Sequence, residues 1–97
     1  MPYVVTATWT VREGSEDTVL DAVRELTPLS RAEPGCRFYQ AYHDPQEPLV
    51  IHLFEIYDDE RAYQAHGDSE HFKRLGFGQA IPALDKRERA FFLAIEP

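Results

Sequence analysis

Several scarcities limit what this chain can be. Lysine and arginine total 10 against 17 aspartates and glutamates, and asparagine is absent from the 97 residues. A single cysteine, Cys36, excludes an intramolecular disulfide. No apolar run reaches the roughly 20 residues that a membrane-spanning helix needs, and no charged segment with an apolar core, as in a secretory signal, precedes the first predicted strand. We therefore expect one cytoplasmic domain over residues 1–97.

The shortage of basic residues also bears on partners. A formal charge of -7 argues against nucleic acid, because such a protein needs a basic face to displace counterions from phosphates. It argues equally against anionic membrane surfaces. Contents of 43% hydrophobic and 28% charged residues are typical of a soluble globular protein. Cys36 is then expected to be a small buried hydrophobe at the start of a strand rather than a reactive thiol.

The first third of the chain reads as a strand followed by a helix. Residues 3–12 are rich in β-branched and aromatic side chains, which predicts a strand with Trp9 on one of its two faces. Ser15 is a good N-cap for the helix that follows. Pro28 should kink or loosen this helix about one turn from its end, and residues 33–35 should terminate it.

The middle of the chain predicts a hairpin of two strands, 36–43 and 49–57, joined by residues 44–48. Pairing His43 with Leu49 gives three further opposed pairs: Gln40 with His52, Phe38 with Phe54, and Arg37 with Glu55. Glu55 is then interpreted as an ion-pair partner of Arg37. Both faces of this hairpin are largely apolar.

The remainder predicts a broken helical region and a last strand. An acidic helix start after Tyr57 leads to a short helix that should stop at Gly67 and resume at Ser69, with glycines making its second half irregular. Residues 87–95 read as the closing strand. The order is therefore βαββαβ, an α+β arrangement of the ferredoxin-like type, with a four-stranded antiparallel sheet and helices on one face.

This architecture leaves one apolar sheet face uncovered. An antiparallel sheet with one solvated face normally alternates between apolar and polar residues, and the middle strands here do not. We predict that a second copy of the chain covers this face, giving a homodimer with sheet-to-sheet pairing, a dimeric α+β barrel. The Arg37–Glu55 pair would lie in or near that interface.

Two short segments resemble those of a known family. The first is SRAEPGC at residues 30–36, where the helix joins the second strand. The second lies within residues 54–72 and consists of Phe54-Glu55, Tyr57-Asp58-Asp59, Ala62, Ala65-His66 and His71-Phe72. These segments resemble the antibiotic biosynthesis monooxygenase (ABM) family of dimeric α+β barrels, and within it the quinol monooxygenase-like members. The resemblance covers nearly the whole chain.

The resemblance implies a cofactor-independent monooxygenase. A quinol, phenol or polycyclic, anthrone-like substrate is deprotonated and its anion reduces dioxygen directly, inside a dry aromatic pocket that supplies a base and hydrogen bonds. No metal, flavin or other cofactor is expected. Because one fold hosts many activities, the alternative is a non-catalytic module for small-molecule binding or detoxification.

Haem degradation is disfavoured within the same resemblance. Haem-degrading relatives rely on an Asn in the first strand, a Trp on the helix after the third strand, and a His one helix further on. The corresponding positions here are Ala7, His66 and Gly76, and no shift of alignment can supply an asparagine that the chain does not contain.

His66 is the leading candidate for the catalytic base, since an imidazole changes protonation near neutral pH. The alternative is a ring that caps the end of its helix. His52 is a second candidate base if its strand face lines a cavity, and otherwise a ring hydrogen-bonded to a neighbour such as Gln40. His71 is expected to be structural. Metal binding by His66 and His71 is not expected, because ligand pairs on one helix face lie three or four residues apart.

Aromatic side chains are the expected substrate contacts, although packing in the core explains each of them as well. They are Trp9, Phe38, Phe54, Tyr63, Phe72 and Phe77.

Overall fold

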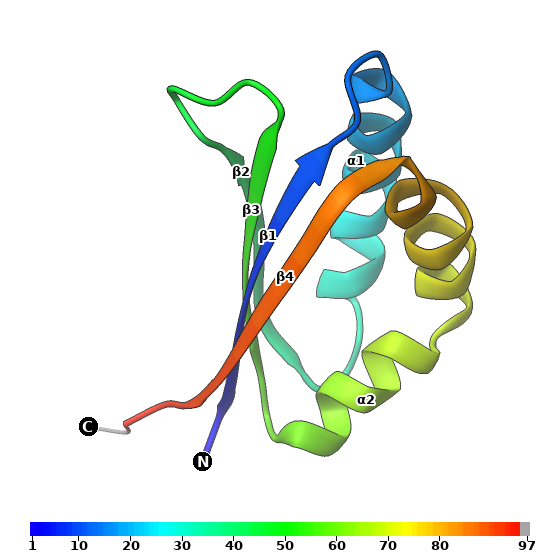
Figure 1. The fold of residues 1–97 in the computed structure, drawn as a ribbon. Helices are drawn as coiled ribbons and strands as arrows, with labels where there is room; N and C mark the ends of the chain where they lie inside the picture. Colours follow the sequence, from blue (N-terminus) through cyan, green and yellow to red (C-terminus); the bar gives the residue numbers. More distant parts are fainter. Residues whose placement is uncertain (96–97) are drawn as a thin grey trace.

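Four antiparallel strands form one sheet in the order β2-β3-β1-β4, and within the described residues all helices lie on one side of it (Figure 1). The structure is a computed structural model that describes residues 1–95. Its elements are β1 (Tyr3–Val11), α1 (Glu16–Arg31), β2 (Cys36–His43), β3 (Val50–Tyr57), α2 (Glu60–Asp68), η1 (Phe72–Ala80), η2 (Ile81–Ala83) and β4 (Leu84–Leu93). This confirms the ferredoxin-like α+β fold.

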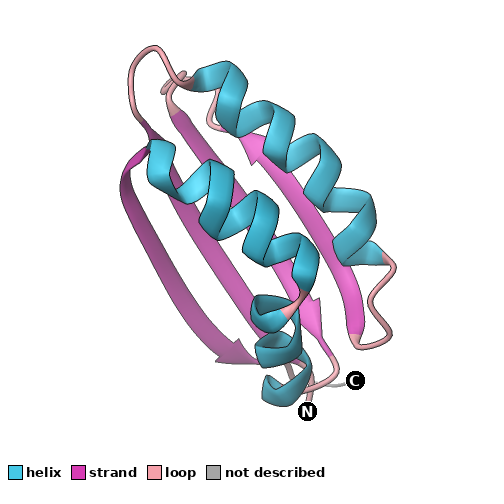
Figure 2. Cartoon of the chain, turned by 90° about the vertical axis from the view of Figure 1, so that its right-hand side faces the viewer, coloured by secondary structure: helices cyan, strands magenta, loops and turns pink. Residues whose placement is uncertain are grey.

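The strand β1, one of the two central strands, and the long helix α1 contribute a large part of the core, and Figure 2 shows the helices lying across the sheet. In β1 the odd-numbered residues from Val5 to Val11 are buried while the even-numbered ones are partly exposed, as the alternation predicts. Helix α1 packs its apolar stripe on this face. The stripe consists of Val19, Ala22, Val23, Leu26 and Ser30, all buried.

The ends of α1 differ in detail from the prediction. Ser15 occupies the N-cap position, but its side chain makes no capping hydrogen bond. The helix continues through Pro28 to Arg31. Thr27 Oγ1 donates to the carbonyl of Val23 at 2.7 Å.

The predicted register of the β2–β3 hairpin is wrong by two residues. His43 pairs with Ile51 rather than Leu49, and Tyr42 lies opposite His52. The longer loop forms because the Asp44 carboxylate accepts hydrogen bonds from the backbone N–H groups of Gln46 and Glu47, which organises a turn. A shift of two keeps every side chain on its predicted face.

A bulge at the start of β2 moves one side chain, that of Cys36, to the other face of the sheet. Cys36 pairs with Tyr57, and the register then shifts before Phe38. Cys36 consequently packs on the core, and burial raises the pKa of its thiol to about 11. Arg37 instead lies beside Asp58, with Nε 2.6 Å from Oδ1. The predicted Arg37–Glu55 pair does not form.

The break between α2 and η1 falls at Ser69 rather than Gly67. Helix α2 runs through Gly67 to Asp68, and Ser69 adopts an extended conformation. The Ser69 hydroxyl donates to the carbonyl of His66 at 2.6 Å and accepts from the N–H of Phe72 at 3.2 Å. One side chain therefore ends the first helix and supports the start of the next, which is wound as a π-helix.

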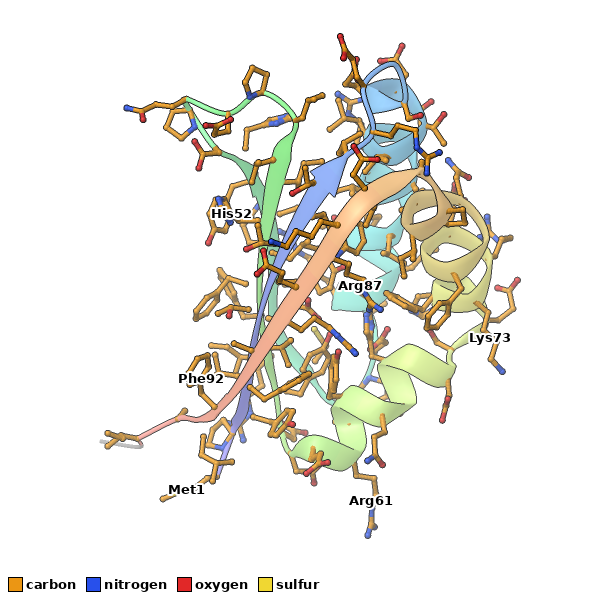
Figure 3. The ribbon with its side chains drawn as sticks, viewed as in Figure 1. Met1, His52, Arg61, Lys73, Arg87 and Phe92 are labelled. Carbon is orange, nitrogen blue, oxygen red and sulfur yellow. The ribbon has the colours of Figure 1, made fainter. Side chains whose placement is uncertain are left out.

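Strand β4 begins at Leu84, three residues earlier than predicted, because Leu84 pairs with Val11 and is buried against the core. The opposite sheet face carries no helix within residues 1–95, and Figure 3 shows His52 and Phe92 pointing away from the helices there. Phe38, Tyr42 and Phe92 are about half exposed on this face. In the described part of the chain, no helix has the length and apolar character needed to cross a bilayer.

Candidate functional site

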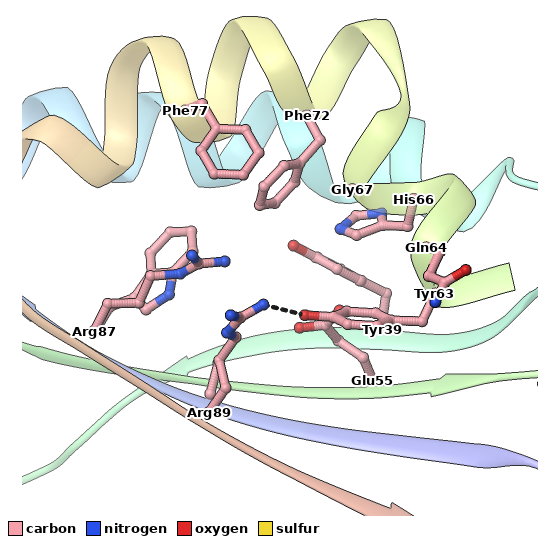
Figure 4. A pocket seen from close by; sticks show the side chains of 12 residues that line it. Tyr39, Glu55, Tyr63, Gln64, His66, Gly67, Phe72, Phe77, Arg87 and Arg89 are labelled. Atoms are coloured by element: carbon pink, nitrogen blue, oxygen red, sulfur yellow. Dashed lines mark hydrogen bonds between the residues drawn. The ribbon is translucent and has the colours of Figure 1, made fainter. Parts of the chain in front are cut away.

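A cavity of about 100 Å³ opens between the sheet and the layer of α2 and η1 (Figure 4). Its wall comes from all four strands of the sheet, from α2 and from η1. The lining residues are Ala7, Trp9, Tyr39, Glu55, Tyr63, Gln64, His66, Gly67, Phe72, Phe77, Arg87 and Arg89. The lining thus combines aromatic rings with ionisable groups, which is the usual character of a small-molecule site.

His66 lies in the last turn of α2 and is only 2% exposed. Its Nδ1 is 2.8 Å from Oε2 of Glu33. Its ring packs against Phe72, with centroids 4.8 Å apart, and against Tyr39 at 5.6 Å. A carboxylate oxygen only accepts hydrogen bonds, so Nδ1 carries the proton and Nε2 is the nitrogen left for the cavity.

Glu33 binds two histidines at once. His71 Nε2 also reaches Oε2 of Glu33, at 2.5 Å, from the start of the next helical segment. The three ligand atoms lie within 4.8 Å of one another, and two imidazoles with one carboxylate are a set that divalent transition metals accept. The short separations from the carboxylate are those of charge-assisted hydrogen bonds. The group therefore works as a hydrogen-bonded support behind His66.

Glu55 occupies a different place from the one predicted. It is 5% exposed, lines the cavity on the helix side of β3, and accepts a hydrogen bond from the Tyr57 hydroxyl at 2.5 Å. Burial is the main cause that raises the pKa of its carboxyl. The interpretation of Glu55 as an interfacial ion-pair partner of Arg37 is wrong, because β3 alternation points it into the core.

Strand β4 brings two cations to the cavity. Arg89 donates from Nη1 to the Tyr63 hydroxyl at 2.9 Å. Arg87 lies over the Phe77 ring, 5.8 Å from its centroid. Arg87 is also the cross-strand partner of Trp9. Because residues two apart on a strand share a face, both arginines point toward the helices.

The wall contributed by η1 depends on a glycine. Phe72 and Phe77 meet edge to face with centroids 5.1 Å apart. A Cβ placed at Gly76 would lie 2.8 Å from the Phe72 ring. Any side chain at this position would therefore press on the ring that forms the cavity wall.

The structure brings together some of the predicted site residues and not others. Five of them line the cavity: Trp9, Tyr63, His66, Phe72 and Phe77. Three lie on the opposite sheet face, outside this cavity: Phe38, His52 and Phe54.

His52 has its own surroundings on that opposite face. Its Nε2 lies 3.2 Å from Oδ2 of Asp44, its Nδ1 3.3 Å from Oγ1 of Thr8, and its ring 5.4 Å from that of Tyr42. None of these is the predicted partner Gln40. The sheet separates His52 from His66, so the two do not form one site within a single copy of the chain.

Besides Glu55, sequence reasoning missed Glu33, Tyr39, Arg87 and Arg89 as residues of the site. Strand alternation could have found the two arginines, since both share the face of β4 that pairs with Ala7 and Trp9. No local pattern could have found Glu33, which precedes a turn and meets His66 only in the folded chain.

Solved structures share this fold over their whole length. Rv0793 from Mycobacterium tuberculosis is 22% identical, with a TM-score of 0.90 and coverage of 100% of this chain and 98% of that one. PA3566 from Pseudomonas aeruginosa is 24% identical, with a TM-score of 0.86 and coverages of 98% and 95%. A protein described as an antibiotic biosynthesis monooxygenase is 27% identical, with a TM-score of 0.89 and coverages of 99% and 100%.

No curated protein matches the chain. The family model described as antibiotic biosynthesis monooxygenase matches residues 2–75, a span that runs from β1 into η1 and includes Glu33, His66 and Phe72. The chain therefore belongs to the antibiotic biosynthesis monooxygenase family.

Proposed function

We propose that this protein is a cofactor-independent monooxygenase that oxidises a single-ring phenol or quinol with dioxygen, using His66 as the base. The family and its structural relatives support a monooxygenase-like function in general. The observation that carries the finer proposal is the hydrogen bond from His66 Nδ1 to Glu33. It leaves Nε2 as a proton acceptor in an aromatic cavity.

The proposed reaction starts with proton transfer. The phenolic O–H bond breaks and an N–H bond forms at Nε2 of His66, while Glu33 stabilises the resulting imidazolium. The phenolate gives one electron to dioxygen, and the aryloxyl radical and superoxide combine to form a ring C–O bond. His66 returns its proton to the peroxide. Water then leaves as the O–O and ring C–H bonds break, and a quinone carbonyl remains.

The size of the cavity favours one aromatic ring over several. A cavity of about 150 Å³ in another protein holds benzene, whereas this one has about 100 Å³ and an open mouth. A space of this size between the sheet and the Phe72–Phe77 wall leaves room for no more than one ring. A polycyclic, anthrone-like substrate would extend out of the cavity.

A homodimer formed through the uncovered sheet face is part of the proposal. Phe38, Tyr42 and Phe92 are each about half exposed there, and exposed apolar surface gathered on one face is typical of an interaction surface. A second copy would bury these rings against its own. The cytoplasm remains the expected compartment, since a lone thiol fits a reducing environment.

Oxygen consumption tests the catalytic proposal. The wild type, His66→Ala and the control His52→Ala would be assayed with hydroquinones, monocyclic phenols and an anthrone. We expect uptake with one-ring substrates, a loss of about 100-fold or more in His66→Ala, and little change in His52→Ala. Equal rates in all three proteins would remove His66 from the mechanism. Saturable binding of the same compounds without oxygen uptake in the wild type would favour the non-catalytic binding module.

A further inference from the structure

Two buried hydrogen-bond donors of the cavity wall have no partner within the described residues. Trp9 is 2% exposed, and its indole Nε1 has no hydrogen-bond acceptor. Nε of Arg87 is also buried and without an acceptor. The two residues are cross-strand neighbours on β1 and β4, and both line the cavity.

Such a pair calls for an acceptor from outside the chain. Buried polar groups in native proteins are nearly always hydrogen-bonded, and each exception needs an explanation. Indole and guanidinium groups are donors only, so neither can satisfy the other. A ligand with oxygen atoms in the cavity can supply the acceptors that these two donors lack.

The charge of the same region favours an anionic acceptor. Arg87 and Arg89 both contribute guanidinium groups to the cavity. Its one carboxyl group, Glu55, is already bound by the Tyr57 hydroxyl, and burial favours the neutral form of Glu55 by raising its pKa. A carboxylate matches the planar guanidinium better than a neutral oxygen does.

Figure 4 shows how Arg87 lies relative to the proposed base. Arg87 is on the left of the view and His66 is to its right, and the Phe77 and Phe72 rings lie on the helix side between them. An aromatic ring between Arg87 and His66 would have one substituent near His66 and another near Arg87.

We propose that the cavity binds a single-ring aromatic carboxylate, such as a hydroxybenzoate, with the carboxylate accepting hydrogen bonds from Trp9 Nε1 and Arg87 and the ring packed on Phe72 and Phe77. The opposite substituent, a phenolic hydroxyl, would face His66. Turnover of such a ligand rests on the proposed function, whereas its binding does not. The same donors could instead hold the hydroxyl oxygen of a phenol that has no carboxylate, and the test separates these two sources.

Calorimetry with three matched probes provides the test: benzoate, its neutral analogue benzamide, and phenol. Trp9 is the one tryptophan of the chain, so quenching of its fluorescence would report occupancy of the cavity directly. We expect benzoate to bind the wild type at least tenfold more tightly than benzamide or phenol. Equal affinities for benzoate and benzamide would overturn the proposal, and this comparison requires no variant to fold.

Variants then locate the binding site. Arg87→Gln should weaken benzoate binding at least tenfold, and Trp9→Phe, followed by calorimetry, should weaken it several-fold. The matched control is Lys86→Gln, which removes one positive charge from the exposed neighbour that pairs with Glu88. Equal losses in Arg87→Gln and Lys86→Gln would show a general charge effect and contradict the site.

Oxygen uptake with 4-hydroxybenzoate and 2,5-dihydroxybenzoate separates this inference from the proposed function. Selective benzoate binding without uptake would keep the carboxylate site and reject the oxygenase. Oxygen uptake with uncharged quinols, in a protein that does not prefer benzoate, would support the oxygenase and reject the carboxylate site.

Discussion

Glu33 accepts a hydrogen bond from Nδ1 of His66 across 33 positions of sequence, at 2.8 Å. The bond joins the segment after α1 to the last turn of α2, and His71 reaches the same carboxylate oxygen. This contact fixes the proton of the buried His66 ring on Nδ1 and leaves Nε2 as the acceptor nitrogen.

Replacing Glu33 should therefore reduce catalysis without emptying the cavity. In Glu33→Gln the neutral amide no longer stabilises the imidazolium, and we expect kcat to fall about tenfold or more while KM changes little. Steady-state oxygen uptake measures both constants. The control is Glu25→Gln, an exposed carboxylate beside Arg74. A kcat equal to that of the control would reduce Glu33 to a packing role.

Glu55 should make stability depend on pH in a defined direction. Its pKa is raised above the ordinary value of 4.5 in the folded protein, so folding favours the protonated form. The stabilisation is complete below the unfolded pKa and is lost as the pH rises through the folded value.

Urea unfolding from pH 4 to pH 8 measures this effect. The Glu55→Gln side chain cannot ionise. Its urea midpoint should therefore rise relative to that of the wild type as the pH increases. The control is Glu13→Gln, which shows how the urea midpoint changes with pH when an exposed carboxylate is removed. A constant difference between wild type and Glu55→Gln across this range would contradict the raised pKa.

Two glycines provide a matched pair of substitutions. In Gly76→Ala the new methyl group would lie 2.8 Å from the Phe72 ring, and such overpacking destabilises by about 1–3 kcal/mol. In Gly67→Ala, in the last turn of α2, the new methyl group would meet nothing within 4 Å, and alanine is favoured over glycine in a helix by up to about 1 kcal/mol. Opposite shifts of the urea midpoint are expected. Equal shifts would mean that Phe72 moves without resistance.

Metal removal should leave the proposed reaction intact. Dialysis against EDTA is expected to preserve oxygen uptake, because the base and the substrate contacts are side chains. Added Zn²⁺ should inhibit, since it would compete for the nitrogens of His66 and His71 beside Glu33. If chelation abolished oxygen uptake and one added divalent metal restored it, the reaction would require that metal, and the cofactor-independent mechanism would be wrong.

The open sheet face should control assembly. Phe92→Glu places a charge where the proposed homodimer buries an aromatic ring, and we expect a shift from dimer to monomer in analytical ultracentrifugation at micromolar concentration. Glu13→Gln, an exposed residue in the turn after β1 and outside the open sheet face, is the control. A wild type that sediments as a monomer would reject the dimer itself.

Much of the fold follows from local pattern. Alternation in β1 and the apolar stripe of α1 identify the buried side chains, because each element has one face that must leave water. The two-residue error in the hairpin did not move any side chain to the wrong face, whereas the bulge at Cys36 did. Turn geometry around Asp44 and bulges depend on hydrogen bonds that strand patterns do not encode.

The sequence by itself determined the order of the elements, the uncovered apolar face, the family resemblance and His66 as the base candidate. Each of these depends on residues close together in the chain. Only the tertiary structure decided that Glu33 supports His66, that Arg87 and Trp9 share a cavity, and that His52 lies on the other side of the sheet. These relationships join elements that meet only when the sheet and the helices pack, so their geometry depends on long-range contacts and burial rather than on local spacing.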